Sequence, residues 1–460
     1  MNSFRNPKYL ERREDVVFDL EQPLVTNPAN DATQNRSNIR FVADNKGEVT
    51  PFDWYNARFS MDFKVNLLAN GGDIAAADHN GIVNGSNVFI KKLTILANGR
   101  EVYSCNNANH CLNIKHLLEY SPSYAESIAT NEFYFLDTTR NPDEDRFTTR
   151  QVQHGRNDAG NGWEARNFVE SFSGTYNKGF AARKALVGTS DTVNCEIPIN
   201  RYSFFESLEN KLLPNTRIEL NLEIDKDDNL IWQNGANCRI IITRLQFFVP
   251  RLIFNAEGQK LYMENYLKPY KWTYLNEVVE TSNNTKQQTG LFKITTGISK
   301  PRHVFIFIIN SAYIDSQTVN PFLYNTFSIS TNPRTLNRCY LEVGNGNEYP
   351  ELHYKPNTDL SRLYRDVMGY VYANNDFQGG TLLTRSNFES LFPFVYFDLT
   401  KQKMDIKDGV TKLTFHYELS GAATTDYNIY AFVLHEKDAE IDQQTGKLLL
   451  RAKTPQSVSS

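Results

Sequence analysis

The sequence predicts an all-β chain in which one arrangement of antiparallel strands occurs twice. Three observations favour this fold: the aromatic composition, segments with apolar residues at every second position, and a common order of similar units in the two halves. The chain has 460 residues with 30 Phe and 24 Tyr but only 5 Met, and such a composition is typical of sheets. With 40% hydrophobic residues, this length suits two to four domains with sizeable cores.

Three segments alternate apolar and polar side chains, which is the pattern of a strand with one buried face and one wet face. They are residues 59–67, 216–224 and 411–419. Such strands are typical of antiparallel sheets, which keep one face in water. Many short strands joined by tight turns predict a sandwich or a barrel. The Asn-Gly and Asp-Gly pairs, which favour tight hairpin turns, begin at Asn70, Asn80, Asn84, Asn98, Asn161, Asn234, Asn345 and Asp408.

Five features recur in the same order in both halves, which indicates an internal duplication. Each half has an Asn-Gly hairpin, a helical pattern, a short apolar strand, an alternating strand and a long apolar strand. The two alternating strands share an opening Thr, a basic second residue and Glu at position eight. We expect the boundary near residues 250–260. The five features occupy residues 93–102, 111–120, 196–200, 216–224 and 238–249 in the first half and 340–349, 359–370, 396–400, 411–419 and 427–436 in the second.

One polar stretch, residues 138–166, is rich in Gly and Asn and has no period. It predicts a long loop leaving the first half. Long loops on a rigid β scaffold are commonly contact elements, but a solvated insertion without a specific role fits the same pattern.

The charge balance excludes a strongly basic nucleic-acid coat and an acidic disordered tail. The chain carries 49 Lys and Arg against 53 Asp and Glu, a formal net charge of −4. Its N-terminus lacks the apolar region of a signal peptide, and its longest apolar stretch, 303–310, is far shorter than the roughly 20 residues that span a bilayer. We therefore expect a soluble protein. Five scattered cysteines suit a reducing compartment in which thiols pack as small hydrophobes.

The sequence contains no nucleophile elbow, phosphate-binding loop, zinc-protease motif or dinucleotide-binding motif. Cys105, His110, Cys111 and His116 could suggest a zinc site, but their spacing on a predicted helix favours core packing and solvation. The acidic run 225–229 resembles the start of a calcium loop. However, Leu230 and Ala236 stand where that loop needs Gly and Glu, so we expect a polar hairpin tip.

The remaining polar candidates are dispersed along the chain. The eight histidines have no evident Ser or Cys partner with an orienting carboxylate, and His416 lies on the polar face of its strand. Asp143 and Asp145 lie in the polar stretch, where solvated charge is the default interpretation. Basic and acidic residues alternate near the N-terminus, so direct nucleic-acid binding is not expected. Trp163 and Trp232, in predicted polar loops, are the candidates for stacking on sugars.

Three stretches resemble the double jelly-roll major capsid proteins of the Polinton (Maverick), virophage and adenovirus-type viral lineage. Residues 89–139 are similar to that family's strand, Asn-Gly hairpin, helix with a Leu-Leu-x-Tyr close and Asp-containing exit. Residues 176–231 resemble its stretch from Asn-x-Gly-x-x-x-Arg, through an Ile-Pro strand, to a Leu-Pro turn. Residues 391–400 resemble its apolar strand ending Asp-Leu-Thr. In this sequence the second stretch places the motif at Asn177, Gly179, Arg183, Ile197, Pro198, Leu213 and Pro214.

The resemblance implies an all-β fold of two tandem eight-stranded antiparallel jelly rolls, with short helices and long loops. It covers about residues 55–440, which is most of the chain. The termini would be arms that reach under or between capsomers, or simply frayed ends. The expected organisation is an N-terminal arm over 1–45, a first roll over 46–252 with the loop 138–166, a second roll over 253–442 and a C-terminal tail over 443–460.

The resemblance also implies a structural capsid protein that is not an enzyme. Three copies would form a pseudo-hexameric capsomer, and capsomers would tile the icosahedral shell of a DNA virus. Its partners would be its own copies and a penton or minor capsid protein, and its place the virion, after synthesis in the host cytoplasm and assembly there or in the nucleus. No catalytic, cofactor-binding or metal-binding residue and no cofactor is expected. The alternatives are a carbohydrate-binding or hydrolytic β-sandwich and a scaffold trimer of the same fold that stays outside the virion.

Overall fold

The fold is built from two sets of eight strands, each divided between two antiparallel sheets. The computed structural model describes residues 4–22, 24, 36–44, 50–75, 80–83, 85–142, 147–156, 163–172, 176–213, 216–233, 235–265, 271–284, 286–294, 298–328, 335–344, 346–374, 380–400, 402, 412–441 and 448–451.

The first set forms the sheets β1-β12-β3-β9 and β2-β10-β5-β6. In chain order from one to eight, the strands of these sheets therefore follow the orders 1-8-3-6 and 2-7-4-5. The strands are β1 (Leu10–Phe18), β2 (Ile39–Ala43), β3 (Arg58–Leu67), β5 (Ile90–Ala97), β6 (Arg100–Asn106), β9 (Val193–Pro198), β10 (Ile218–Ile224) and β12 (Cys238–Phe254).

The second set forms the sheets β13-β20-β15-β18 and β14-β19-β16-β17, with the additional strand β21 paired to β20. Numbered in the same way, these strands also follow 1-8-3-6 and 2-7-4-5. Two packed four-stranded sheets with this connectivity are a jelly roll, so the chain holds two, named roll 1 and roll 2 below. The strands are β13 (Lys271–Asn284), β14 (Thr289–Ile294), β15 (Pro301–Asn310), β16 (Leu336–Val343), β17 (Asn347–Tyr354), β18 (Val395–Asp398), β19 (Leu413–Leu419), β20 (Tyr427–Ile441) and β21 (Leu448–Arg451).

Each of the five duplicated sequence features falls on the same element of its roll. The matched alternating segments are β10 and β19, which are the seventh strand in each roll. The first hairpin turns at Asn98 and Gly99, whose φ angles of 51° and 76° are the positive values that a tight hairpin turn needs. Asn345 of the second hairpin lies outside the described residues.

Helices, 3₁₀ turns and a pair of short strands lie in the connections between the strands of the rolls. The helices that follow the fifth strands of the two rolls, α1 and α7, are long, whereas most others are short. The strands β4 (Asn80–Ile82) and β11 (Ile231–Gln233) form a separate pair. The α-helices are α1 (Ala108–Glu119), α2 (Pro122–Glu126), α3 (Lys178–Val187), α4 (Ser203–Glu206), α5 (Asp227–Leu230), α6 (Ala256–Asn265), α7 (Leu360–Asn374) and α8 (Arg385–Ser390), and the 3₁₀ turns are η1 (Pro7–Tyr9), η2 (Trp54–Asn56), η3 (Ser86–Phe89), η4 (Ile128–Thr130), η5 (Ile199–Arg201) and η6 (Ser311–Tyr313).

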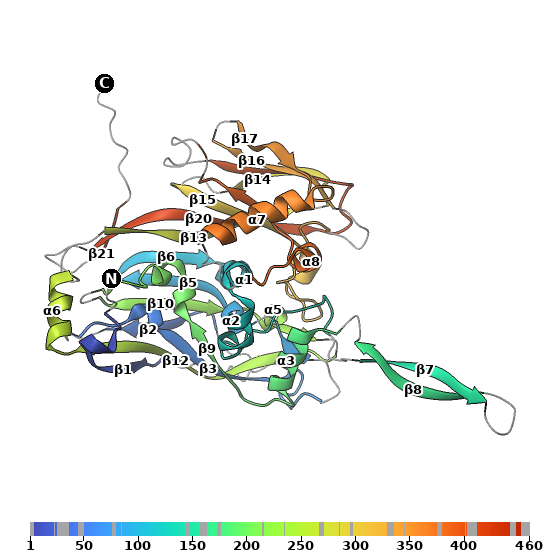
Figure 1. Cartoon of the computed structure of the whole chain (residues 1–460), viewed down its shortest axis with the longest axis horizontal. Coiled ribbons are helices and arrows are strands. Elements are labelled where there is room, and N and C mark those ends of the chain that lie inside the picture. Colours follow the sequence, from blue (N-terminus) through green and yellow to red (C-terminus); the bar gives the residue numbers. More distant parts are fainter. Residues whose placement is uncertain are drawn as a thin grey trace.

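Strands replace irregular chain in three segments where the sequence predicts a loop or an arm. In the expected loop 138–166, β7 (Phe147–Arg156) pairs with β8 (Trp163–Phe172) in a hairpin that extends away from both rolls (Figure 1). In the expected arm 1–45, β1 and β2 belong to roll 1 because they bond to β12 and β10. In the expected tail 443–460, β21 pairs with β20. Polar composition hid β1, because an edge strand needs few apolar residues, whereas β2 and β21, with five and four residues, are too short to show a clear period.

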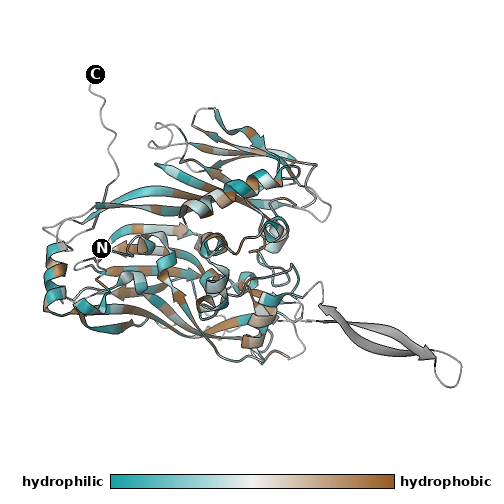
Figure 2. Cartoon of the chain, in the orientation of Figure 1, coloured by the Kyte–Doolittle hydropathy of each residue, from teal (hydrophilic) through white to brown (hydrophobic). Residues whose placement is uncertain are grey.

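The four sheets of the two rolls lie one above another (Figure 1). Roll 1 lies below roll 2, and β6 of roll 1 approaches β13 of roll 2. Apolar and polar residues alternate along many strands (Figure 2), whereas β15 is buried along nearly its whole length. A strand buried on both faces reads as a continuous apolar run. The run at 303–310 therefore marks the sheet of roll 2 that roll 1 covers.

Candidate functional site

Helix α1 of roll 1 lies in the junction between the two rolls and is buried from Ala108 to Leu118. Asn113 on this helix donates hydrogen bonds to the hydroxyl of Tyr324, at 2.9 Å, and to the carbonyl oxygen of Phe322, at 3.2 Å. The ring of His110 lies with its centroid 5.5 Å from that of Phe307 on β15 and 5.2 Å from that of Tyr430 on β20. The helix therefore belongs to roll 1 by sequence and packs on the sheet of roll 2.

A cluster of charged side chains, of which Lys115 and Glu277 are buried and Glu206 is half exposed, crosses the same junction. The Nζ atom of Lys115, on α1, lies 3.1 Å from Oε1 of Glu277 on β13 and 2.7 Å from Oε2 of Glu206 on α4. Tyr103 on β6 donates to the other oxygen of Glu277 at 2.6 Å. Burial alone lowers the pKa of Lys115, but Glu206 and Glu277 raise it well above its ordinary value. The amine therefore stays charged and bridges the two rolls.

A cavity of about 340 Å³ opens beside this cluster. Lys115, Glu119 and Glu206 line it together with residues 273–275 of β13. Burial raises the pKa of Glu119 to about 7. Two carboxylates at one cavity are the arrangement that glycoside hydrolysis requires. Here, however, the carboxylate of Glu206 forms an ion pair with Lys115. This ion pair engages Glu206 in the junction, so it is not free to act as a catalytic acid or base.

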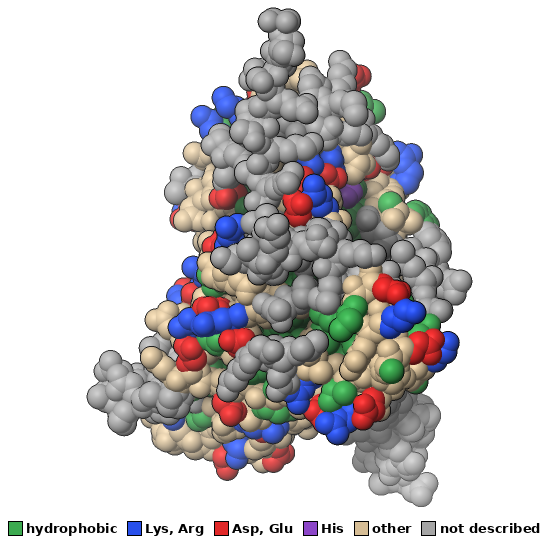
Figure 3. Space-filling model, turned by 90° about the vertical axis from the view of Figure 1, so that its left-hand side faces the viewer, with side chains coloured by type: hydrophobic (Ala, Val, Ile, Leu, Met, Phe, Trp, Pro, Cys, Tyr) green, Lys and Arg blue, Asp and Glu red, His purple; other side chains and the backbone are tan. Residues whose placement is uncertain are grey.

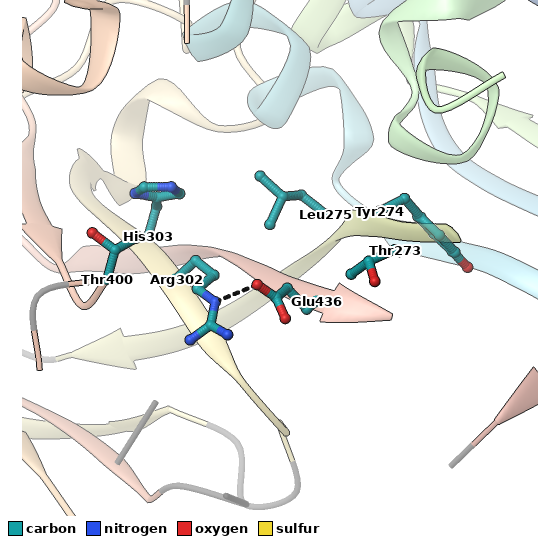
Figure 4. Close-up of a pocket in the computed structure, with 7 residues that line it drawn as sticks. All are labelled: Thr273, Tyr274, Leu275, Arg302, His303, Thr400 and Glu436. Atoms are coloured by element: carbon teal, nitrogen blue, oxygen red, sulfur yellow. Dashed lines mark hydrogen bonds and ion pairs between the residues drawn. The ribbon is translucent and has the colours of Figure 1, made fainter. Parts of the chain in front are cut away.

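A second cavity, of about 520 Å³, is lined by the same residues 273–275 of β13 (Figure 4). Arg302 and Glu436, from the neighbouring strands β15 and β20, point toward each other and pair at 2.6 Å. Nδ1 of His303 lies 2.9 Å from the hydroxyl of Tyr396, and burial lowers the pKa of His303 to about 4. Among the described residues that line this cavity, Glu436 is the only acid, and it is ion-paired with Arg302, so these residues do not supply the pair of carboxylates that glycoside hydrolysis uses.

The four Cys and His residues considered for zinc are packed into the protein. Sγ of Cys105 lies 3.8 Å from Sγ of Cys111, and both thiols are buried. His116 stacks on Tyr120 with 4.4 Å between ring centroids. Burial lowers the pKa of His110 to about 3, as expected for an imidazole among aromatic rings. Among the described residues, no group of three or more His, Cys, Asp or Glu side chains is arranged to hold a metal ion.

The acidic run 225–229 is not the solvated hairpin tip that the sequence predicts. Asp225 and Asn229 are buried, and residues 227–230 form the short helix α5. Asp227 pairs with Arg36 at 2.7 Å, and Asp225 accepts a hydrogen bond from Asn109 at 2.9 Å. The spacing of polar residues within 225–229 could not predict this burial, because the partners Arg36 and Asn109 come from distant parts of the chain.

Of the two tryptophans proposed for sugar stacking, only Trp232 has a described side chain. Trp232 lies in β11, is 1% exposed and packs edge-on against Phe180, so its expected position in a polar loop is wrong. Trp163 begins β8, and its side chain lies outside the description, as do Asp143 and Asp145. His416 does face solvent from β19, 2.9 Å from Glu342 and stacked on Tyr340.

The Asn-x-Gly-x-x-x-Arg motif holds the base of the β7–β8 hairpin. Asn177 caps α3 and donates to the carbonyl oxygens of Thr139 and Asn141 at 3.1 and 3.2 Å. A Cβ atom on Gly179 would lie 2.4 Å from the carbonyl oxygen of Leu136, so only glycine fits there. Arg183, which is fully buried, pairs with Asp137 at 2.5 Å. The motif and the Asp-containing exit, 40 residues apart in sequence, thus form one structural unit.

Sequence reasoning missed the junction residues Lys115, Glu206 and Glu277. The available signal was the continuous apolar run of β15, because it shows that this sheet has no wet face. On the face in Figure 3, blue and red side chains are interspersed without a field of one sign. No helix in the described parts of the chain is long and apolar enough to cross a membrane.

Comparisons with known proteins agree with this topology. A chain from the cryo-EM structure of the Sputnik virophage aligns with a TM-score of 0.58 at 10% identity, over 97% of this chain and 90% of that one. The Faustovirus major capsid protein gives 0.54 at 8% identity, over 95% and 92%. The mavirus major capsid protein gives 0.53 at 10% identity, over 95% and 90%. No family model and no curated protein sequence matches the chain. At these identities the likeness establishes the fold, a double jelly roll.

Proposed function

We propose that this chain is the major capsid protein of a virus, a structural protein without catalytic activity. The observation that carries this proposal is the double jelly roll over nearly the whole chain, with the same strand order in both halves, together with its likeness to the Faustovirus and mavirus major capsid proteins. Two similar rolls in each of three copies give six similar lobes, and a tile with a near-sixfold outline can pack into a curved shell.

The proposed organisation follows the strands. Roll 1 extends from β1 to β12, roll 2 from β13 to β20, and α6 joins them. The proposed assembly is a homotrimer that forms pseudo-hexameric capsomers in the virion. Neighbouring capsomers and a penton or minor capsid protein are the proposed partners. Assembly in the host cytoplasm or nucleus, and a place in the Polinton lineage, belong to the same proposal. A double-sheet jelly roll is one of the architectures that limit uncontrolled pairing of strand edges, which a crowded shell protein has to avoid.

Light scattering after size-exclusion chromatography, with negative-stain microscopy, tests this function. We expect a trimer of 3 × 52.9 ≈ 159 kDa with a six-lobed outline, and hexagonal lattices or particles on concentration. A chain that stays monomeric and forms no lattice under any assembly condition contradicts the proposal. A scaffold of the same fold is distinguished by composition, because a coat protein is present in purified particles and a scaffold is not.

The hydrolytic alternative has one specific observation in its favour, the cavity that Glu119 and Glu206 share. Its test is hydrolysis of a panel of chromogenic glycosides by the wild type and by Glu119→Gln. We expect no turnover by either protein, because Lys115 already binds Glu206. Turnover that Glu119→Gln abolishes would favour the hydrolase.

A further inference from the structure

Two buried cysteines lie in contact where roll 1 turns from β6 into α1. Sγ of Cys105, near the end of β6, lies 3.8 Å from Sγ of Cys111, in the first turn of α1. The two side chains are 2% and 0% exposed. A disulfide bond needs its sulfur atoms about 2.05 Å apart, so the two sulfur atoms would have to approach each other by roughly 1.8 Å.

The turn between β6 and α1 brings the two thiols together. Asn107, the N-cap residue of α1, has a φ of 59° and a ψ of 38°, a left-handed conformation that Asn adopts more readily than most residues. His110 donates its backbone N–H to the carbonyl oxygen of Asn107 at 3.1 Å, and Cys105 is paired with Leu93 across β5 and β6. Regular structure therefore holds one cysteine on each side of a single tight turn.

The same two elements hold one carboxylate of roll 2. Tyr103, two residues before Cys105, donates to one oxygen of Glu277 at 2.6 Å. Lys115, four residues after Cys111, donates to the other oxygen at 3.1 Å. A covalent bond between the two cysteines would therefore tie β6 to α1 directly beside the contact that joins roll 1 to roll 2.

We propose that Cys105 and Cys111 form a redox-controlled disulfide that ties β6 to α1 beside the junction of the two rolls. The pair is a dithiol in a reducing compartment and closes when the chain meets a small disulfide such as glutathione disulfide. This modification goes beyond the capsid role and does not depend on assembly.

The bond forms by two successive exchange steps. One protein thiolate attacks a sulfur atom of glutathione disulfide, which forms a mixed disulfide and releases one glutathione thiolate. The second protein thiolate then attacks the protein sulfur atom of the mixed disulfide, forms the Sγ–Sγ bond and releases the second glutathione thiolate. Two protein thiols are oxidised, one glutathione disulfide is reduced to two glutathione molecules, and these take up the two protons.

Burial controls how fast the bond can form. It raises the pKa of the Cys111 thiol well above its ordinary value, and the thiolate is the attacking species. Glutathione disulfide reaches side chains this deeply buried only after local opening of the chain. We therefore expect slow closure in the folded chain, and faster closure in mild denaturant or at higher pH.

Peptide mapping of the full chain tests the bond directly. Trypsin cuts after Arg100 and Lys115, and no Lys or Arg lies between them, so both cysteines fall in one peptide, residues 101–115. The reduced protein is incubated with glutathione disulfide, with and without mild denaturant, and is then unfolded, alkylated, digested and analysed by mass spectrometry. We expect this peptide to lose the mass of two hydrogen atoms and to carry no alkyl group. After treatment with dithiothreitol it should carry two.

The remaining cysteines provide internal standards for the mapping. Each of them falls in a tryptic peptide of its own, so none of these peptides can close an internal disulfide. These cysteines are Cys195, Cys238 and Cys339.

Thermal unfolding with and without dithiothreitol measures what the bond does to stability. The oxidised wild type should unfold at a higher temperature than the reduced wild type, because the closed loop restricts the unfolded chain. Cys111→Ala, which replaces a buried thiol by a small apolar side chain, should show no such increase. Cys195→Ala, at a buried cysteine on β9, is the matched control and should keep the full increase.

Two results overturn the disulfide. One is a 101–115 peptide whose cysteines carry alkyl or glutathione groups after oxidation in both conditions. The other is an oxidised wild type that unfolds at or below the temperature of the reduced protein. If Cys111→Ala does not fold, the mapping and the unfolding of the wild type decide by themselves. None of these measurements needs assembly, so their outcome is separate from that of the proposed function.

Discussion

At the scale of single residues, the junction contains an ion pair whose two side chains are almost fully buried. Lys115 and Glu277 come from different rolls, and their side chains are 4% and 0% exposed. Removing one partner of a buried pair leaves the other uncompensated, which costs about 3–5 kcal/mol, whereas replacing both costs far less. We therefore expect the pair to disfavour placements of the rolls that separate Lys115 from Glu277.

We expect Lys115→Met to lower the free energy of unfolding by about 3–5 kcal/mol. The double variant Lys115→Met/Glu277→Gln should recover much of that loss, because no unpaired charge stays buried. Denaturant titration measures both. Lys178→Met is the surface control, because Lys178 is 71% exposed and pairs with Glu126 at 3.6 Å, and its effect should stay below about 1 kcal/mol. If Lys115→Met lowers the free energy of unfolding by as little as Lys178→Met does, the cluster does not stabilise the junction.

The lowered pKa of His110 predicts that the stability of the folded chain depends on pH. Burial lowers its pKa to about 3 in the folded chain, against about 6.5 when unfolded. Below pH 6.5 the unfolded chain therefore binds a proton that the folded chain does not, and stability falls as pH decreases toward 3, by up to about 1.4 kcal/mol per unit. Above pH 7 both states are neutral, and this contribution is fully present.

When the pH is lowered from 7 to 4.5, the free energy of unfolding should fall by about 2 kcal/mol less in His110→Phe than in the wild type. Denaturant midpoints across this range measure the difference, and the two proteins should have parallel profiles between pH 7 and 8. His303 and His435, whose pKa values burial lowers to about 4, keep part of the acid sensitivity in both proteins. Parallel profiles over the whole range contradict the prediction.

At the scale of elements, the β7–β8 hairpin stands apart from the rolls. Its strands contact each other extensively, and the Asn177 cap holds the chain at its base. A lone two-stranded hairpin is marginally stable in water, so it adds little to the stability of the body.

Replacing residues 143–175 by a short Gly-Ser linker should leave the thermal unfolding midpoint within about 2 °C of the wild type. Asn177→Ala should lower it, because the backbone groups of Thr138, Thr139 and Asn141 lose their partly buried hydrogen bonds to the Asn177 side chain. Calorimetry on the two variants provides the comparison. A large loss on excision of the hairpin would show that the hairpin packs on the body.

At the scale of the whole molecule, the two rolls share one continuous hydrophobic core that includes strands from both. Contacts of this kind couple the unfolding of one roll to that of the other. We therefore expect a single cooperative calorimetric transition, with equal calorimetric and van't Hoff enthalpies for the isolated subunit. Two resolved transitions contradict this, and would mean that the junction is weaker than either roll.

Sequence patterns predicted the fold well because the same features occur in both halves, so a strand or hairpin recognised in one half supports its counterpart in the other. The alternating strands β10 and β19 and the two hairpins were recognisable, since period two and Asn-Gly turns are local properties. The strands β1, β7 and β8 were not, because their largely polar sequences lack a clear period, and β21 was not, because a run of four residues is too short to show one. The burial of Asp225 and Trp232 was also missed, since their partners lie far away in the chain.

The sequence by itself determined the all-β class, the duplication and the order of elements within each half, because local periodicity and turn residues encode them. Only the tertiary structure decided which faces are covered. Lys115, Glu277 and His110 acquire their roles from contacts between the rolls. Packing across a junction is a relation between distant segments, and local sequence does not record it.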